Sequence, residues 1–313
     1  MKCSVLLPVY NGGAFLPSAI ESILKQEESD FEFLLIDDCS TDPSAQIIHR
    51  YAESDRRIRS IFHKQNAGLA ATLNEGLAEA RCDLVVRMDQ DDLALPTRIA
   101  TQVEFMCRRP EIVVAGSFVY HMGRRPVDDH LIELPAEHEE IVRTLVRENC
   151  IYHPSVIMRR QQILSLGGYR AEFRNSEDYD LWLRAAKVYR LANYPKPLLR
   201  YRFSVTGMTL GRKWQQATYT KMAVIANSHP EWSLDRIRQE AEAELGSLGK
   251  DWFLEQVARG TIQELIRLRL YGDAARILWT FSRQLDRKRA TRLAGEFGSG
   301  LLRACLRGTG AAP

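Results

Sequence analysis

The sequence predicts an α/β protein with a mostly parallel central sheet that is covered by helices on both faces. Over the first half of the chain, short apolar runs alternate with stretches of helical periodicity. The runs are apolar nearly throughout, which is typical of parallel strands buried on both faces. From about residue 214 onward the pattern is helical only. We therefore expect a helical region after the sheet.

Five apolar runs are predicted as strands, and polar loops follow three of them. The runs span 3–9, 31–37, 58–62, 83–89 and 112–120. "YNGG" follows the first run, "DDCSTD" the second and "DQDD" the fourth. Ligands of such sheets bind beyond the carboxyl ends of the strands, near the switch in strand order. We therefore expect these three loops to share one rim.

Helical periodicity fills the intervals between the first strands. One predicted helical face consists of Phe15, Leu16, Ala19, Ile20, Ile23 and Leu24. A second is indicated by leucines that repeat every four residues, Leu69, Leu73 and Leu77. Asp42 and Pro43 are typical of the N-cap and the first-turn proline of a helix that reaches Tyr51.

Beyond residue 120 the pattern is mixed. It indicates a helix over 136–148, an apolar stretch over 151–158, and a helix that starts at Ser176. The buried face of that last helix is expected to include Leu181, Trp182 and Ala185.

Glycines cluster in "VTGMTLGRK", residues 205–213, and we expect a domain boundary there. The length of 313 residues suits one large domain or two ordinary ones. The expected parts are an α/β domain over 1–205 and a helical region over 206–313.

The composition indicates an ordinary globular protein of a reducing compartment. Hydrophobic residues make up 45% and charged residues 27% of the chain, which argues against disorder and fibrous repeats. None of the six cysteines forms the close pair that zinc sites or disulfide-rich domains use. Pro8 and Asn11 interrupt the first apolar run before a signal-peptide core or membrane span could form. We therefore expect a cytoplasmic protein.

Positive charge is concentrated near the C-terminus. The net charge is +3, but residues 259–308 hold eleven Lys or Arg and four acidic residues, a formal charge of +7 that leaves −4 for the remainder. Attraction to an anionic partner is therefore expected in this tail alone, and no nucleic-acid partner is expected. One helical face of the tail contains Ile277, Leu278, Phe281 and Leu285, with arginines on its flank. Binding to an anionic membrane and packing inside the protein both remain open for this face.

The motif "MDQDD" places Asp89, Asp91 and Asp92 at the end of a predicted strand. Two carboxylates at positions i and i+2 can face one small volume and bind Mg²⁺ or Mn²⁺, which is commonly shared with a substrate diphosphate. A solvated turn with Asp92 as the N-cap of a helix explains the same residues. The motif alone leaves both interpretations open.

Three further segments carry candidate chemistry, each with a structural alternative. Asp38 in "IDDCSTD" could accept a hydrogen bond from a nucleotide, or belong to a turn. Glu177 and Asp178 could include a general base, or favour a helix N-terminus electrostatically. Asn66 and Gly68 could approach a nucleotide, although neither a dinucleotide-binding nor a P-loop glycine motif is present.

Taken in order, six motifs resemble the family 2 glycosyltransferases, inverting enzymes of the GT-A (Rossmann-like) fold. The motifs are "PVYNGG", "IDDCSTD", "QNAGLAATLNEGL", "RMDQDD", "YHPSVIMRR" and "SEDYDLWLR", and the resemblance covers roughly residues 2 to 204. Each motif is weak alone, but their order and spacing are specific. The resemblance implies transfer of a sugar from a nucleoside-diphosphate sugar, with UDP favoured, to a hydroxyl group.

The resemblance also implies a role for each matching residue. Asp178 matches the catalytic base, Asp91 the ligand of Mn²⁺ or Mg²⁺, and Asp89 a residue near the ribose or the metal. Asp38 matches the residue that contacts the base. The other matching positions would bind nucleotide or shape the acceptor site, with Glu177 and Trp182 on the acceptor side and Arg202 near the diphosphate: Pro8, Tyr10, Asn11, Asn66, Gly68, Glu177, Trp182 and Arg202.

Residues 205–313 contain neither the apolar spans of processive synthases nor their "QxxRW" motif, which favours transfer of a single sugar. The implied acceptor is a glycan or lipid-linked intermediate of cell-surface polysaccharide synthesis, reached from the inner face of the cell membrane. Two other functions stay open, a non-catalytic sugar-nucleotide-binding or assembly protein and a sugar nucleotidyltransferase. The intact aspartates argue against the first, and the absence of a glycine-rich, lysine-containing N-terminal loop argues against the second.

Overall fold

The computed structural model describes residues 1–203, 210–283, 285 and 287–308. The chain forms two compact units: residues 1–120 with 131–202, and residues 121–130 with 203–313. The sequence did not indicate that 121–130 belongs with the C-terminal helices. The boundary that we expected at 205–213 lies largely outside the described residues.

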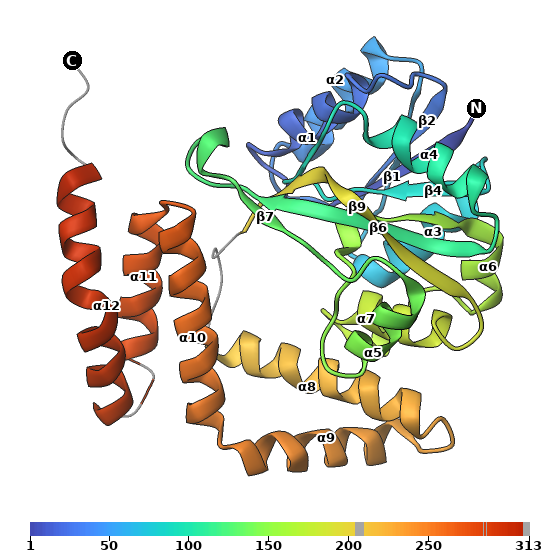
Figure 1. Ribbon diagram of the computed structural model, residues 1–313. Coiled ribbons are helices and arrows are strands. Elements are labelled where there is room, and N and C mark those ends of the chain that lie inside the picture. Colours follow the sequence, from blue (N-terminus) through green and yellow to red (C-terminus); the bar gives the residue numbers. More distant parts are fainter. Residues whose placement is uncertain (204–209, 284, 286, 309–313) are drawn as a thin grey trace. The chain divides into compact units, whose positions relative to one another are not determined.

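The first unit contains a sheet with the strand order β3-β2-β1-β4-β8-β6-β9-β5, in which β7 also pairs with β6 (Figure 1). Four neighbouring strands are parallel: β1 (Cys3–Val9), β2 (Phe31–Asp37), β3 (Ile58–Phe62) and β4 (Leu84–Arg87). The others are β5 (Leu93–Ala94), β6 (Ile112–His121), β7 (His130–Ile132), β8 (Ile157–Arg159) and β9 (Arg190–Tyr201). β8 is antiparallel to β4 and β6, and β5 is antiparallel to β9. The sheet is thus parallel from β3 to β4, and the pairs that β8 and β5 form are antiparallel.

Helices of the expected kind connect these strands. They are α1 (Leu16–Leu24), α2 (Ser44–Ser54), α3 (Leu69–Glu79), α4 (Arg98–Arg108), α5 (His138–Leu145), α6 (Arg160–Ser165) and α7 (Glu177–Ala185), with short 3-10 turns at Pro126–Asp128, His153–Ser155 and Ala171–Phe173. Of the predicted α1 face, four residues are buried, Leu24 is partly buried, and Phe15 is exposed at the N-cap. Pro43 is the N-cap of α2 instead of a first-turn residue, and the Asp42 carboxylate accepts the Ser44 N–H at 3.0 Å. The helix therefore starts one residue later than expected.

The order of the strands creates a switch point between β1 and β4. From β1 the chain moves outward to β2 and β3, and then returns to β4 on the other side of β1. The loops after β1 and β4 are joined at this point, because Gln90 Oε1 accepts the Tyr10 N–H at 2.9 Å and Gln90 Nε2 donates to the Tyr10 carbonyl at 3.0 Å. A ligand site is expected here from the topology alone.

The second unit is helical, as the sequence predicted. It contains α8 (Leu210–Ser228), α9 (Leu234–Leu248), α10 (Lys250–Arg267), α11 (Tyr271–Ser282) and α12 (Arg287–Gly308), of which the last three pack side by side (Figure 1). Ile277, Phe281 and Leu285 are buried in the core of this unit, and Leu278 packs against it. The apolar face of the tail is therefore internal. Among the described helices, none combines the length and the hydrophobicity needed to cross a membrane.

Candidate active site

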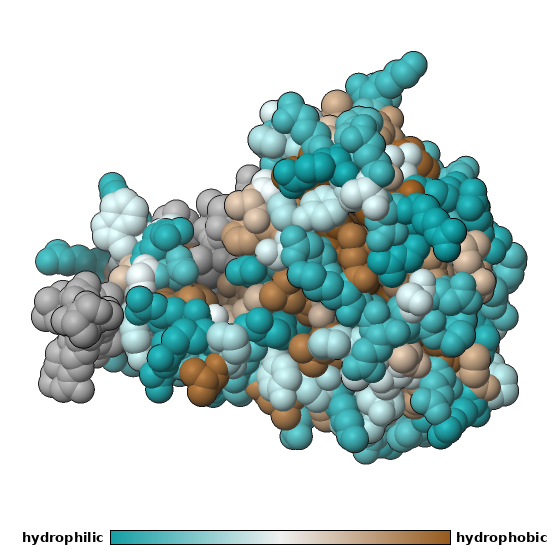
Figure 2. Space-filling model, turned by 90° about the horizontal axis from the view of Figure 1, so that it is seen from above, coloured by the Kyte–Doolittle hydropathy of each residue, from teal (hydrophilic) through white to brown (hydrophobic). Residues whose placement is uncertain are grey.

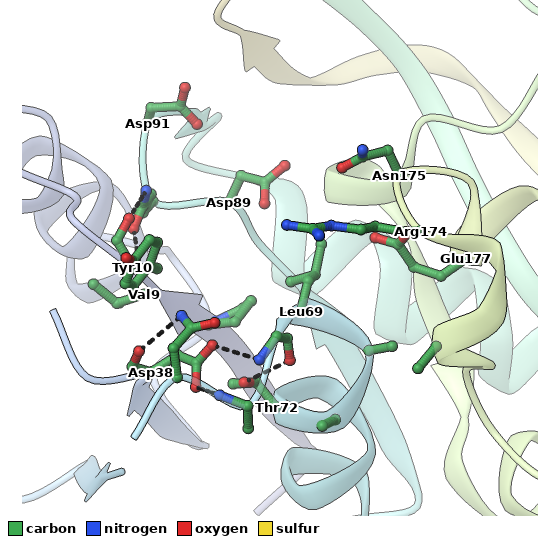
Figure 3. A pocket seen from close by; sticks show the side chains of 18 residues that line it. Val9, Tyr10, Asp38, Leu69, Thr72, Asp89, Asp91, Arg174, Asn175 and Glu177 are labelled. Carbon is green, nitrogen blue, oxygen red and sulfur yellow. Dashed lines mark hydrogen bonds between the residues drawn. The ribbon is translucent and has the colours of Figure 1, made fainter. Parts of the chain in front are cut away.

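A cavity of about 640 Å³ opens at the switch point of the sheet. Its walls include Tyr10 after β1, Asp38 after β2 and Asp89 after β4, so the three loops share a rim as predicted. The first turn of α3 and the start of α7 complete the lining. Figure 3 shows Asp89 and Asp91 on one wall, with Arg174 and Glu177 reaching in from the segment around α7.

Most of the site residues that the sequence predicted line this cavity. They are Pro8, Tyr10, Asp38, Asn66, Gly68, Asp89, Asp91 and Glu177. Four predicted residues are not part of the lining: Asn11, Asp178, Trp182 and Arg202.

Asp38 organises the loop that leads into α3. Its Oδ1 accepts the Ala67 N–H at 2.7 Å and its Oδ2 accepts the Gly68 N–H at 2.9 Å. Gly68 has a φ of +87°, a conformation that favours glycine and lets the chain turn into the helix. A carboxylate oxygen can accept two hydrogen bonds, so Asp38 Oδ2 retains capacity for a donor on a ligand.

His63 bridges Asp38 and the first turns of α3. Its Nδ1 lies 2.7 Å from Asp38 Oδ1, and its Nε2 lies 2.6 Å from Glu75 Oε2. Burial lowers the pKa of His63, but the hydrogen bonds to the two carboxylates outweigh it and raise the pKa on balance. This imidazole therefore strengthens the floor of the cavity.

The three aspartates after β4 crowd their negative charges together. The ligand atoms of Asp89, Asp91 and Asp92 all lie within 4.8 Å of one another. Burial, and then the charge of Asp89, raise the pKa of Asp91. A divalent cation would relieve this repulsion, and a set of carboxylate oxygens is what Mg²⁺ and Mn²⁺ prefer. The residues present therefore fit such an ion.

Asp92 does not cap a helix, so the alternative interpretation of this residue as an N-cap is wrong. The chain after it forms β5, which pairs with β9, and α4 begins only at Arg98. Asp92 is 1% exposed, and its Oδ1 accepts the Arg202 N–H at 2.7 Å. Burial and the two neighbouring aspartates raise its pKa well above the ordinary value.

Arg87 supports the aspartate cluster from inside the sheet. It is 2% exposed, and its Nη2 lies 2.5 Å from Asp89 Oδ1. Its Nε and Nη1 have no hydrogen-bond partner among the described residues. Sequence reasoning missed Arg87, although a charged residue within the apolar run "LVVRM" was a visible signal.

Glu177 and Asp178 begin α7 and point in different directions. Successive residues of a helix are turned by about 100°, so the two side chains cannot face the same space. Glu177 lines the cavity, whereas Asp178 Oδ2 accepts a hydrogen bond from Asn149 Nδ2 at 2.8 Å. Burial, and then the charge of Asp178, raise the pKa of Glu177 to about 7. Burial also raises the pKa of Asp178.

Asn11 and Arg202 lie outside the lining of the cavity but contact the loops that form it. Asn11 has a φ of +52°, and its Oδ1 accepts the Thr41 N–H at 2.8 Å, which joins the loops after β1 and β2. Arg202 Nε donates to the Asp91 carbonyl at 2.9 Å, while its guanidinium lies 4.2 Å from the ring centre of Phe15. Both residues therefore position loops that carry lining residues.

Trp182 is fully buried and packs edge-on against His153, with ring centres 5.9 Å apart. Its burial confirms the predicted buried face of α7, which also includes Leu181 and Ala185. A role at the acceptor site stays a prediction for Trp182, which lies outside the lining of the cavity. His153 is itself buried and bonded through Nε2 to the Tyr169 hydroxyl at 2.9 Å, which agrees with a structural role.

The structure adds lining residues that the sequence did not suggest. Arg174 brings a positive charge into the cavity, and Asn175 beside it has a φ of +61°. Gln90, which stands between Asp89 and Asp91 in the sequence, also lines the cavity. The basic residue just before "NSED" was the available signal for Arg174.

The match to the family model agrees with this site. The model "Glycosyl transferase family 2" matches residues 4–167, and the chain therefore belongs to this family of glycosyltransferases. The chain is 37% identical over 187 residues to the putative glycosyltransferase EpsE of Bacillus subtilis, covering 58% of this chain and 66% of EpsE. It is 32% identical over 205 residues to the O-antigen biosynthesis glycosyltransferase WbnJ of Escherichia coli, covering 64% and 78% respectively.

Solved structures share the fold. Residues 1–349 of TarS from S. aureus, in complex with UDP-GlcNAc, match with a TM-score of 0.59 at 16% identity, over 96% of this chain and 92% of that one. The mannosyltransferase PcManGT from Pyrobaculum calidifontis, in complex with GDP-Man and Mn²⁺, matches with a TM-score of 0.58 at 18% identity, over 98% and 86%. The predicted GT-A architecture is thereby confirmed.

Proposed function

We propose that this glycosyltransferase is metal-dependent and inverting, and that it moves one sugar from a UDP-sugar to a hydroxyl group. The observation that carries the proposal is the cluster of Asp89, Asp91 and Asp92 at the rim of a cavity at the switch point. Mg²⁺ or Mn²⁺ would be held by Asp91 and Asp89, and would neutralise charge on the diphosphate when bound. UDP is favoured because related structures were solved with UDP and UDP-GlcNAc.

Asp178 is the proposed base on the acceptor side. Its carboxylate takes the proton of the acceptor hydroxyl while that oxygen bonds to C1 of the sugar. The bond from C1 to the diphosphate breaks in the same step, so the configuration at C1 inverts and the nucleoside diphosphate leaves. Asp178 lies outside the lining of the cavity, which suits contact with a second substrate, and Asn149 orients its carboxylate at 2.8 Å.

We propose a glycan or lipid-linked acceptor in the synthesis of cell-surface polysaccharide. The names of three relatives support this class: WbnJ acts in O-antigen biosynthesis, AmsE of Erwinia amylovora in amylovoran biosynthesis, and a third is an E. coli galactosyltransferase named for a diphosphoundecaprenol-linked sugar. Residues 1–205 would form the catalytic domain and 206–313 a separate helical region. A cytoplasmic protein, bound peripherally to the inner face of the membrane, would meet such an acceptor.

The test of this function separates donor binding from turnover. A panel of nucleotide sugars is screened with and without Mn²⁺ for an increase in melting temperature, because a bound ligand stabilises the folded state. We expect one UDP-sugar to stabilise the wild type only with Mn²⁺, and Asp91→Asn to abolish this shift. Asp178→Asn should keep the shift and lose turnover with an acceptor extract.

The matched control is Asp30→Asn, an exposed aspartate at the surface, which should behave as wild type. Normal turnover by Asp178→Asn would refute the base assignment. A metal-independent shift in the Asp91→Asn variant would refute the metal site. Binding without turnover by the wild type, whatever the acceptor, would favour a non-catalytic binding protein.

A further inference from the structure

Two imidazoles and one carboxylate converge in the helical unit. His121 is the last residue of β6, His130 is the first of β7, and Glu264 lies on α10. All three belong to the second compact unit. Glu264 Oε1 lies 2.8 Å from His121 Nδ1 and 3.0 Å from His130 Nδ1, and the three ligand atoms lie within 4.8 Å of one another. One carboxylate oxygen therefore faces both rings.

These distances are close to those of a metal centre. Zn²⁺ binds histidine nitrogen and carboxylate oxygen at about 2.0–2.2 Å, so neighbouring ligands of a tetrahedral ion lie roughly 3.3–3.5 Å apart. The observed separations of 2.8 and 3.0 Å would have to open by only about half an ångström. Small changes of side-chain torsion angles achieve this without movement of the backbone.

Metal binding would change where the protons of the cluster lie. Each histidine Nδ1 now lies at hydrogen-bond distance from Glu264 Oε1. A neutral imidazole and an ionised carboxylate are the forms that bind metals, so the proton between each Nδ1 and the carboxylate would leave Nδ1 when the ion takes its place.

Arg267 is the cation nearest to this cluster. Its Nη1 lies 3.4 and 3.3 Å from the two ring nitrogens of His130, and 3.3 Å from Glu264 Oε2. Equal distances to both nitrogens at this range place Nη1 over the face of the ring, because an in-plane position would collide with the carbon between them. Arg267 thus does not stand between His130 Nδ1 and Glu264 Oε1. Its side chain is 58% exposed and can turn into solvent when a cation enters.

The segment that carries both histidines is held by other contacts. Arg124 N–H donates to the Leu268 carbonyl at 3.0 Å, and Arg269 Nε lies 3.1 Å from Asp128 Oδ1. A Cβ at Gly123 would lie 2.3 Å from the Asp128 carbonyl oxygen, so the turn closes tightly at glycine. The ligands are therefore preorganised before any ion binds, which lowers the entropic cost of binding.

We propose that His121, His130 and Glu264 form a Zn²⁺ site that fastens segment 121–130 to α10. Two nitrogen donors and one oxygen donor suit a borderline ion such as Zn²⁺ better than Mg²⁺ or Mn²⁺, which prefer all-oxygen sites. Water would complete the coordination. The protein would then bind two metals of different character, a hard ion in the donor cavity and Zn²⁺ here.

The experiment measures zinc binding to the full chain in an Asp89→Asn, Asp91→Asn background, which removes the oxygen-donor cluster. After chelator treatment and dialysis, Zn²⁺ is titrated by calorimetry, and Co²⁺ is added as a spectroscopic probe. We expect one equivalent of Zn²⁺ and the intense visible absorption of four-coordinate Co²⁺. Both should be lost in His121→Gln and in His130→Gln, and retained in the control His229→Gln, an exposed histidine of the same unit.

Circular dichroism verifies that each variant is folded, and His130→Gln serves if His121→Gln does not fold, because His130 is the more exposed ligand. Absence of a zinc equivalent in the background protein would overturn the proposal and leave a hydrogen-bonded cluster only. A zinc equivalent that both histidine variants retain would also overturn it.

Discussion

The donor cavity depends on a charge that lies inside the sheet. Arg87 is almost completely buried, and Asp89 is the acidic partner in contact with its guanidinium. A buried ion pair adds little net stability, but removal of one partner leaves the other charge uncompensated. Arg87 therefore acts through Asp89: it sets the direction of one carboxylate of the metal-binding cluster.

Asp89→Asn should destabilise the protein by about 3 kcal/mol, because the buried Arg87 guanidinium loses its partner. Arg87→Met should cost less, because the Asp89 side chain that remains is 31% exposed. Arg87→Met should also weaken Mn²⁺-dependent binding of the donor, because the orientation of Asp89 is lost. The measurement is urea denaturation of Arg87→Met, Asp89→Asn and the double variant. The double variant should be more stable than the sum of the single effects predicts. Strictly additive effects would show that the pair is not coupled.

Glu177 should make stability depend on pH. Its folded pKa is raised from 4.5 to about 7, so the folded state holds the proton more tightly than the unfolded state. The resulting stabilisation is complete below the unfolded pKa and is lost as the pH rises through about 7. At 1.36 kcal/mol per pKa unit, the difference amounts to about 3 kcal/mol.

Glu177→Gln should therefore leave stability nearly unchanged at pH 4 and raise it progressively between about pH 5 and 8, relative to wild type. Thermal unfolding over this pH range measures the difference. Glu172→Gln, an exposed glutamate of the preceding segment, is the control and should show no such trend. A constant difference between Glu177→Gln and wild type at every pH would contradict the raised pKa.

Sequence reasoning found the residues of the cavity that stand at the ends of strands. Asp38, Asp89 and Asp91 follow strands whose carboxyl ends were expected to share one rim, and the family resemblance then implied their roles. Arg87 shows the limit, since its role depends on the side of the sheet to which one residue of a strand points. A shift of one residue in a strand changes the face, and a helix changes it by about 100°.

At the scale of elements, the parallel strands were predicted with close boundaries and the short strands were missed. β1, β2 and β3 match the predicted runs residue for residue. β1 and β2 are buried throughout, which makes such strands nearly continuously apolar, whereas β3 is the edge strand and only its Ile58 is buried. β5 has two residues and β7 has three, too few to show a period. Their pairing partners β9 and β6 lie far away in sequence, and a local pattern carries no information about them.

The packing of α3 on β1 can be tested through its central glycine. A Cβ at Gly76 would lie 2.3 Å from Leu6 Cδ1, and Leu6 is itself buried in the sheet. Gly76→Ala should therefore cost about 1–3 kcal/mol through overpacking, despite the better helix propensity of alanine. Gly260→Ala on α10 is the matched variant, because nothing lies within 4 Å of the added Cβ. It should stabilise by about 0.5–1 kcal/mol.

Urea denaturation of both alanine variants measures these effects. Opposite signs for the two substitutions are the expected result. If Gly76→Ala were as stable as wild type, α3 would have room to shift away from β1, and the floor of the donor cavity would be less rigid than its packing indicates.

At the scale of the whole molecule, the structure shows which face of the basic C-terminal tail is buried. The apolar face of the tail, which the sequence left open to a membrane, is buried within the helical unit. On the face shown in Figure 2, hydrophobic side chains occur in small groups among hydrophilic ones. Basic and aromatic residues at the surface of the helical unit are then candidates for a peripheral membrane contact.

Helix α11 offers such a surface. Trp279 is 62% exposed, and the Arg283 guanidinium lies 4.7 Å from its ring centre. Arg276 stands one turn earlier on the same side; its side chain is 62% exposed and pairs with Asp273 at 3.0 Å. Tryptophan is favoured at the interface of a bilayer, and each basic residue near an anionic surface contributes about 1 kcal/mol. We define Arg276, Trp279 and Arg283 as the α11 patch.

The α11 patch should bind anionic vesicles at low salt. Sedimentation with phosphatidylglycerol vesicles should recover the wild type, and added salt should release it, because screening weakens the attraction. Arg283→Ser should reduce the partition coefficient about fivefold, which corresponds to about 1 kcal/mol. Trp279→Ser should reduce it further, whereas Trp252→Ser, an exposed tryptophan of α10 beside acidic Asp251, should sediment as wild type. If the wild type stays in the supernatant at low salt, the acceptor must be reached without direct binding of this unit to the lipid surface.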